Sequence, residues 1–449
     1  MTGLTESLSR FVANPRIDAP PDAAARIVRT GFIDTVATML AGRNEPVVKI
    51  VRGFVAARRS SAREARILLG EAMAAAADAA LINATAAHAL DYDDVAIGGH
   101  PSTVLVPAIL AEGQCLEVSG ADALRAYLVG YEVWAELFSR EPDPYHIKGW
   151  HPTAVLGTVG AAAAVAHLHR LPAEACRNAL AIAASMAGGL VANFGTMTKP
   201  LHAGRTAACA IDAVRLAAAG LTAAPDVFEH HAGYLAALSP QGRADRASPA
   251  AGLGDRLRIL DFGLSVKKYP MCYSTHRVID GVLDLVQAND LKPADVKAVH
   301  ASIGVTEASM LRNHSPVTGL EAKFSLEFAV ASALVARKVG LQQLNDGFVG
   351  EPQVREAMAK VRTATVDTCC PIDPTFALNN RVIVELKDGR RLDSGDIRFA
   401  RGNAQSPLQD RELKAKFLDC AAGVEGIDAA ALYGRLDKLD ELDSLRNLT

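Results

Sequence analysis

Alanine-rich helical sequence fills most of the first 265 residues, and three short polar segments interrupt it. These segments are HALDYDDVAIGGHPST (88–103), GWHPTAVLG (149–157) and NFGTMTKPLHAGR (193–205). Each one places ionisable side chains beside a helix of small residues, where a buried charge needs a partner or a polar cleft. We therefore expect the three polar segments to form one acid/base pocket.

The composition excludes several classes of protein. The chain has 449 residues, a formal net charge of -3 and 50% hydrophobic residues, so it is long enough to bury sizeable cores. This small net charge, without a dense Lys/Arg run, argues against a nucleic-acid partner. No apolar stretch reaches the ~18 residues of a membrane span, and the N-terminal sequence lacks the pattern of a secretion signal. The seven cysteines include no C-x-x-C pair, so we expect them to be reduced and the protein to be cytoplasmic.

Helices are predicted throughout the first part of the chain. Alanine has the highest helix propensity, and Gly157 and Gly160 would let two helices approach closely. Gly42 is expected to follow its helix as the C′ residue. The predicted helices include 20–42, 71–90, 153–169 and 203–220.

The pattern changes in the second half of the chain. Residues 296–305 alternate as a strand does, and 381–395 predict a hairpin with a tight Asp-Gly turn. The sequence therefore predicts a mainly α protein. We expect an all-helical domain at 1–267, completed by 401–449, and a smaller α+β domain at 268–400. The helices expected in the smaller domain are 273–289 and 322–339.

Asp91, Asp93 and Asp94 lie within four residues and precede His100. Three interpretations stay open. The aspartates form a solvated turn at a helix end, or one of them orients a catalytic His or Lys, or together with His100 they bind a divalent metal. No further His/Glu pair at ligand spacing supports the metal, and H-E-x-x-H is absent.

His100 and His151 each precede a proline at a predicted helix start. Helix N-termini attract anions, so two such starts would suit a carboxylated substrate. The alternative is that His-Pro is simply a favourable way to enter a helix. Because the arrangement occurs twice, we favour the functional interpretation.

Lys199 precedes Pro200 and the next alanine-rich helix, with His202 and Arg205 close behind. The lysine is either a surface cation or a group that binds a carboxylate or carries a proton. We favour the second interpretation because its surroundings are apolar, and we take all three as candidates.

The segment KKYPMCYSTHR (267–277) lies at the predicted domain boundary, where ligand sites are common. Lys267 and Lys268 are expected to be solvated, and His276 and Arg277, at the start of a helix, are the better candidates for contacts with a substrate. Candidate substrate contacts here are Lys268, Tyr269, His276 and Arg277.

Several familiar motifs are missing. The sequence has no phosphate-binding G-x-x-x-x-G-K-[ST], no dinucleotide fingerprint after a strand and no G-x-S-x-G. Acid/base chemistry without a cofactor therefore remains as the expectation.

The polar segments resemble the MmgE/PrpD family, which includes 2-methylcitrate dehydratase, cis-aconitate decarboxylase and iminodisuccinate epimerase. The similar stretches extend over nearly the whole chain and identify the family rather than the reaction. They are IDTVATMLAG, HALDYDDV with GHPST, GWHPTAVLGTVGAA, TKPLHAGRTAACAIDA, KKYPMCYSTHR and EAKFSLEFAVA.

The resemblance implies a large helical domain built from both chain ends, a smaller lid-like domain, a homodimer, and catalysis without a metal or organic cofactor. In the decarboxylase branch the catalytic cluster is Asp, Thr, His, His and Lys, and the Thr falls on Val95 here. The loop from there to His100 is one residue shorter than in that branch, while GWHPT and NFGTMTKPLH are similar to the epimerase branch. The other catalytic positions fall on Asp91, His100, His151 and Lys199.

The family's chemistry implies a lyase or isomerase that moves a proton at a carbon next to a carboxylate of a small di- or tricarboxylic acid. Our first expectation is 2-methylcitrate dehydratase-like activity; the alternatives are iminodisuccinate epimerase-like and cis-aconitate decarboxylase-like activity. Lys199 and Arg277 would hold carboxylates, and His151 would move the proton. His100, held by Asp91, would act as the opposite acid. A metal-dependent lyase and an inactive structural paralogue are the competing classes.

Overall fold

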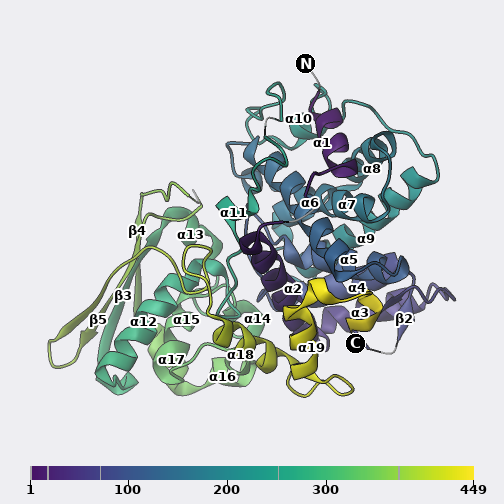
Figure 1. The fold of residues 1–449 in the computed structure, drawn as a ribbon. Coiled ribbons are helices and arrows are strands. Elements are labelled where there is room, and N and C mark those ends of the chain that lie inside the picture. The colour runs from purple at the N-terminus through teal and green to yellow at the C-terminus, as the bar shows by residue number, and fades with distance from the viewer. Residues whose placement is uncertain (1–2, 18–19, 71, 251, 373–374, 449) are drawn as a thin grey trace. The chain divides into compact units, whose positions relative to one another are not determined.

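The computed structural model describes residues 3–17, 20–70, 72–250, 252–372 and 375–448. The chain divides into two compact units, which Figure 1 draws as ribbons. Unit 1 comprises Met1–Ser265 and Gln409–Thr449, and unit 2 comprises Val266–Leu408. Unit 1 is built from helices and unit 2 combines helices with a sheet, so the predicted fold class, mainly α with a smaller α+β domain, is confirmed.

Unit 1 contains long helices joined by short loops, together with a two-stranded antiparallel sheet of β1 (Ala65–Arg66) and β2 (Met73–Ala74). The C-terminal segment returns to this unit, because α18 and α19 pack against α2. The helices are α1 (Leu4–Ala13), α2 (Asp22–Gly42), α3 (Pro46–Ala56), α4 (Ala76–His88), α5 (Ser102–Cys115), α6 (Gly120–Ser139), α7 (Pro152–Leu168), α8 (Ala173–Met186), α9 (Thr198–Ala218), α10 (Tyr234–Leu238), α11 (Ile259–Phe262), α18 (Asp410–Ala421) and α19 (Ala429–Asp437).

Glycines allow the central helices of unit 1 to touch backbone to backbone. A Cβ on Gly160 of α7 would lie 3.0 Å from the carbonyl oxygen of Gly130 in α6. A Cβ on Gly204 of α9 would lie 2.4 Å from the carbonyl oxygen of Leu81 in α4. Close packing of this kind explains why nearly every residue of α7 is buried.

Three local predictions for unit 1 were wrong. Gly42 is the last helical residue of α2 and is followed by a right-handed residue, so it is not a C′ glycine; its Cβ would lie 2.1 Å from the carbonyl oxygen of Ala86, and close approach to α4 explains it. The helix predicted at 71–90 begins at Ala76, after β2. Finally, 221–258 is largely irregular, with α10 as its one described helix.

Unit 2 is organised around a four-stranded sheet in the order β4-β3-β5-β6. The strands are β3 (Val296–Gly304), β4 (Val361–Val366), β5 (Asn380–Leu386) and β6 (Arg391–Ile397). β3 pairs in parallel with β4 and antiparallel with β5, and β5 and β6 form the hairpin. The predicted strand at 296–305 and hairpin at 381–395 are confirmed, whereas β4 was missed.

Helices cover this sheet and complete the core of unit 2. Helix α12 packs directly against it, because a Cβ on Gly281 would lie 2.6 Å from the side chain of Ile397. The buried residues Val278 and Val282 of α12 join Val382 and Val384 of β5 in one apolar core. The helices are α12 (His276–Asn289), α13 (Val305–Met310), α14 (Gly319–Ala322), α15 (Leu326–Val335), α16 (Asp346–Gly350) and α17 (Pro352–Ala359).

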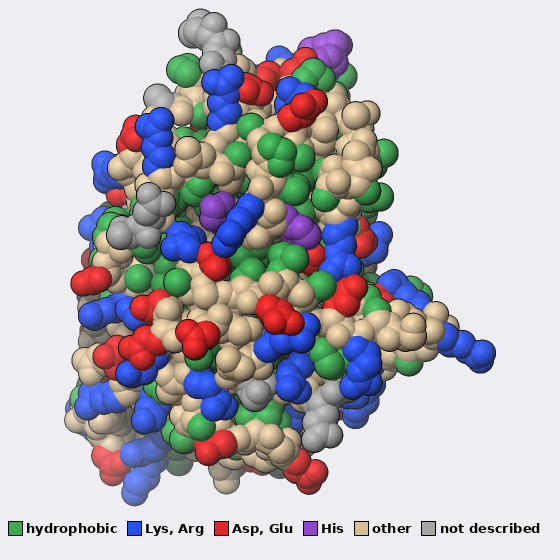
Figure 2. Space-filling model, turned by 45° about the vertical axis from the view of Figure 1, so that its right-hand side comes forward, with side chains coloured by type: hydrophobic (Ala, Val, Ile, Leu, Met, Phe, Trp, Pro, Cys, Tyr) green, Lys and Arg blue, Asp and Glu red, His purple; other side chains and the backbone are tan. Residues whose placement is uncertain are grey.

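Acidic and basic side chains are interspersed on the face of the molecule drawn in Figure 2. Such mixing agrees with the small net charge of the sequence. None of the helices in the described ranges combines the length and apolarity that crossing a bilayer requires.

Candidate active site

Three helix ends bring the polar segments of unit 1 together. Helix α4 ends at His88, α7 begins directly after His151, and Lys199 lies in the first turn of α9. Because α4 and α7 both pack against α9, side chains at these ends meet although they come from distant parts of the sequence. We call the side chains that meet there the polar cluster: His88, Asp91, Asp93, His100, His151, Lys199 and His202.

The loop that carries Asp91, Asp93 and His100 is fixed from both sides. The indole nitrogen of Trp134 in α6 donates to the carbonyl oxygen of Ile97 over 3.1 Å. The backbone nitrogen of His100 donates to the hydroxyl of Thr153 in α7, also over 3.1 Å. Both anchors belong to buried helices, so the loop's functional side chains start from a defined backbone.

Lys199 donates a hydrogen bond to Asp91, and both side chains are 8% exposed. The ammonium also lies 5.3 Å from the centre of the Phe194 ring, a distance at which a cation is attracted to the ring face. Asp91 reaches the lysine from a left-handed backbone conformation, with φ of 52°. The alternative that Lys199 is a surface cation is therefore wrong.

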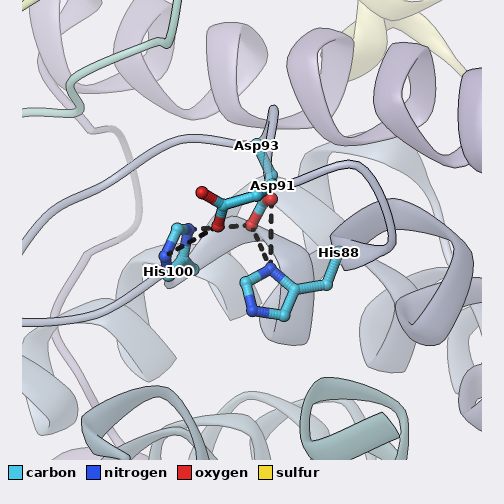
Figure 3. A group of neighbouring side chains, drawn as sticks. All are labelled: His88, Asp91, Asp93 and His100. Carbon is cyan, nitrogen blue, oxygen red and sulfur yellow. Dashed lines mark hydrogen bonds and ion pairs between the residues drawn. The ribbon is translucent and has the colours of Figure 1, made fainter. Parts of the chain in front are cut away.

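Asp93 lies between two imidazoles, as Figure 3 shows. Its Oδ2 is 2.9 Å from His88 Nδ1 and 2.9 Å from His100 Nδ1. Burial acts to raise the pKa of Asp93, but the two imidazoles outweigh it and hold the pKa well below its usual range. The sequence analysis gave the orienting role to Asp91, whose Oδ1 is 4.0 Å from His100 Nε2; the structure places Asp93 there instead.

Asp94 turns away from the cluster. Its carboxyl group bonds the hydroxyl and the backbone nitrogen of Ser102, and that hydroxyl lies 2.7 Å from the Tyr127 hydroxyl. Burial and the nearby charge of Asp34 raise the pKa of Asp94 well above its usual value. All three aspartates are buried, so the interpretation of this segment as a solvated turn is wrong.

His151 contacts His202 through their Nδ1 atoms, which are 3.1 Å apart. One of these nitrogens must donate and the other accept. Burial lowers the pKa of His151 well below its usual value, and the positive charges that His88 and Lys199 can carry act in the same direction. Burial, followed by the charge of Lys199, also lowers the pKa of His202. Both rings are therefore neutral near pH 7, and His151 is available as a base.

The cluster includes a set of atoms that would suit a divalent metal. His88, Asp91, Asp93 and His100 each offer one donor atom, and these atoms lie within 4.8 Å of one another. The sequence analysis counted Asp94 among the possible metal ligands. In the structure Asp94 bonds Ser102 instead, and His88 is the fourth residue whose donor atom lies near the other three. Asp91 already bonds an ammonium and Asp93 two imidazoles, so the same groups can complete their interactions within the protein.

The candidates of unit 2 lie around the start of α12. The Tyr269 hydroxyl donates to Asp280 over 2.6 Å, and His276 is fully buried with its ring 5.2 Å from that of Tyr269. Arg277 Nη1 donates to the carbonyl oxygen of Ala377 over 2.8 Å. These contacts hold the side chains within their own unit.

The two lysines that precede Tyr269 differ in exposure. Lys268 is half-buried, and its charge acts on Asp280. Lys267 is only 1% exposed, so the expectation that it is solvated was wrong.

Two residues of unit 1 differ from the predicted site: Arg205 was predicted but lies outside the polar cluster, and His88 was not predicted but belongs to it. Arg205 is exposed on α9, and its charge acts on Asp212 further along the same helix. His88 was missed, although it is only 1% exposed and bonds Asp93. Its place three residues before Asp91 was the available signal.

Comparison with known proteins agrees with the geometry. The MmgE/PrpD N-terminal domain model matches residues 6–247, and the C-terminal domain model matches 269–435. Human cis-aconitate decarboxylase is 31% identical over 83% of this chain and 78% of its own length. The mouse enzyme is 30% identical over 83% and 77%, and that of Aspergillus terreus is 24% identical over 87% and 84%. On these matches, which cover both units, the chain belongs to the MmgE/PrpD family.

Proposed function

We propose that this chain is a lyase that moves a proton at a carbon next to a carboxylate of a small di- or tricarboxylic acid. The observation that carries the proposal is the buried polar cluster, in which a neutral His151 lies near a Lys199–Asp91 pair and an Asp93–His100 pair. A neutral imidazole can accept a proton, and an ammonium can bind a carboxylate. The names of the relatives support lyase chemistry.

The roles follow from charge and hydrogen bonding. His151 accepts the proton from the substrate carbon, because its low pKa keeps it in the basic form. Lys199 stabilises the negative charge that develops on the adjacent carboxylate. His100 acts as the acid on the other side: with Nδ1–H facing Asp93, the ring must also carry a proton on Nε2, and that second proton is the one it gives to the substrate. Asp91 positions the ammonium of Lys199.

Dehydration of a 2-methylcitrate-like hydroxy acid is the leading reaction. His151 takes the carbon-bound proton, the carbon–oxygen bond breaks, and His100 protonates the departing hydroxyl, so the products are an alkene and water. We propose no metal or organic cofactor for this step, and we retain the homodimer that the family resemblance implies.

Decarboxylation of a cis-aconitate-like acid is the second candidate, and the relatives' names favour it. We nevertheless place dehydration first, because Val95 stands where the decarboxylase branch has its catalytic threonine. Val95 exchanges two backbone hydrogen bonds of 2.9 Å with Ser265, so its backbone is fixed, and its side chain offers no hydroxyl. Val95→Thr would supply that hydroxyl on the same backbone. Cis-aconitate decarboxylation that appears only in this variant would indicate that the missing hydroxyl is what prevents decarboxylation by the wild type.

A substrate panel in heavy water tests the proposal. Purified protein is mixed with 2-methylcitrate, citrate, cis-aconitate or iminodisuccinate and followed by proton NMR. Loss of water from 2-methylcitrate supports the leading reaction, and loss of CO2 from cis-aconitate supports the second candidate. Deuterium uptake on iminodisuccinate without net conversion would support the epimerase alternative instead.

Two variants show whether the cluster does the chemistry. His151→Ala removes the proposed base, whereas His231→Ala changes an exposed histidine of the same unit. Turnover that falls with the first and not with the second supports the assignment. Full turnover in His151→Ala would contradict it.

A further inference from the structure

His88 lies between the two imidazoles to which we assign proton transfer. Its ring centre is 4.6 Å from that of His100, edge to face, and 5.9 Å from that of His151, nearly parallel. It is the last residue of α4, and its side chain is fully buried. The structure therefore fixes His88 through the helix rather than through a flexible loop.

Asp93 links His88 to His100. His88 Nδ1 is 2.9 Å from Oδ2 and 3.1 Å from Oδ1 of this carboxylate, and His100 Nδ1 is 2.9 Å from Oδ2. An ionised carboxylate only accepts hydrogen bonds. The hydrogen bonds of His88 therefore require a proton on its Nδ1. For His100, the 2.9 Å ion-pair distance makes Nδ1 the nitrogen that faces the carboxylate, and a proton on Nδ1 is the one that the carboxylate favours.

The second nitrogen of each ring then has a defined role. Burial lowers the pKa of His88 to about 4, so near pH 7 its Nε2 carries no proton. Within the described part of the chain, this Nε2 is buried and has no hydrogen-bond partner. In His100, Nε2 becomes the nitrogen that gains and loses a proton, and it lies on the side of Asp91, 4.0 Å from Oδ1.

We propose that His88 is a positioning residue that acts through Asp93 to fix the orientation and the tautomer of His100. With His88 in place, one side of the Asp93 carboxylate is occupied, and the carboxylate cannot rotate away from His100. Without His88, Asp93 would keep a single partner in a buried site, and His100 would be free to place its neutral-form proton on Nε2. This inference rests on the proposed role of His100 and adds the residue that prepares it.

Two variants of His88 separate this role from simple packing. In His88→Asn the amide nitrogen replaces Nδ1 as the donor to Asp93. In His88→Gln the amide lies one bond further out, near the position of Nε2, and cannot make the same contact. We expect His88→Asn to stay within about threefold of wild-type kcat, and His88→Gln to lose about 10–100-fold, the usual effect of removing a group that orients a functional side chain. KM should change little in either variant.

NMR of histidine ring nitrogens gives a second readout that needs no substrate. Protein labelled with ¹⁵N in histidine reports which nitrogen of each neutral ring carries the proton. We expect His100 to be protonated on Nδ1 in the wild type and in His88→Asn, and to become a mixture of tautomers in His88→Gln. Even if no compound of the panel reacts, this measurement decides the inference.

Three results would overturn the inference. One is a wild-type His100 with its neutral-form proton on Nε2, which can be measured even if a variant fails to fold. Another is a folded His88→Gln protein with an unchanged His100 tautomer. The third is a fall in kcat of the same size in both variants, which would indicate packing rather than hydrogen bonding.

Discussion

Replacing Lys416 with methionine should destabilise unit 1 strongly, because it leaves a buried carboxylate without its cation. Lys416 Nζ lies 2.6 Å from Asp34 Oδ1, and the two side chains are only 4% and 0% exposed. The same ammonium donates to the carbonyl oxygen of Tyr92 over 2.8 Å and lies 3.9 Å from the centre of its ring. Helix α18 therefore supports the loop between Asp91 and Asp93.

The magnitude follows from the burial of this pair. Removing one partner of a buried ion pair typically costs about 3–5 kcal/mol, because the other charge stays in a poorly polarisable environment. We expect Lys416→Met to fall in that range. Adding Asp34→Asn removes the stranded charge, and since replacing a whole buried pair is often close to neutral, the double variant should recover at least about 2 kcal/mol of the loss.

Urea unfolding followed by tryptophan fluorescence measures this directly. The two tryptophans of the chain, Trp134 and Trp150, both lie in unit 1, so the signal reports on the unit that contains the ion pair. Lys414→Met is the matched control, because Lys414 is an exposed lysine on the same helix, and a change of about 0.5 kcal/mol or less is typical of such sites. A Lys416→Met protein within about 1 kcal/mol of wild type, or a double variant as unstable as the single one, would refute the reasoning.

Three further predictions concern catalysis, pH and metal. His151→Ala and Lys199→Ala should each lower turnover by about 10²–10⁴-fold with an unchanged circular dichroism spectrum, and wild-type turnover in either would remove its assigned role. Burial raises the pKa of Glu132 to about 7, so its folded-state carboxyl holds a proton that the unfolded chain releases above pH 4.5. Wild-type stability relative to Glu132→Gln should therefore fall by about 3 kcal/mol from pH 4.5 to pH 8, at about 1.4 kcal/mol per pKa unit; a pH-independent difference in urea unfolding would contradict this. Dialysis against a chelator should leave turnover unchanged, and a loss that zinc or magnesium restores would favour the metal-dependent alternative.

Elements whose partners are close in sequence were predictable. The alanine-rich stretch 153–169 corresponds to α7 within one residue at each end, since propensity and burial act in the same direction there. The hairpin at 381–395 corresponds to β5 and β6, because its turn and its alternating pattern are both local. In each case a short stretch of sequence contains the whole physical cause.

The missed elements depend on distant partners. Strand β4 has four exposed residues in its six and lies at the edge of the sheet, so its own sequence carries little apolar alternation. It is a strand because it pairs with β3, about 60 residues earlier in the chain. Gly42 is likewise a glycine because the backbone of Ala86, in another helix, leaves no room for a Cβ. A sequence pattern typical of helix ends could not reveal that contact.

The candidate site was predictable as a convergence of segments but not as a network of pairs. The sequence indicated that Lys199 needs a partner, and it did not indicate that Asp91 is that partner rather than Asp93. Partner choice depends on the direction in which each carboxylate leaves the loop. That direction is set by the left-handed conformation of Asp91 and by the contacts of Trp134 and Thr153 with the loop.

The three aspartates of this loop show how one short segment supplies groups of different charge. Asp91 faces an ammonium, Asp93 faces two imidazoles, and Asp94 faces the hydroxyl of Ser102. Their environments separate the pKa of Asp93, which is well below the usual range, from that of Asp94, which is well above it. Asp94 therefore holds its proton more strongly than its neighbour Asp93 does, although both residues are aspartates. Asp94→Asn should then change the charge of the site less than Asp93→Asn, which removes the carboxylate that faces His100. The proposed chemistry therefore requires Asp93→Asn to lower turnover far more than Asp94→Asn.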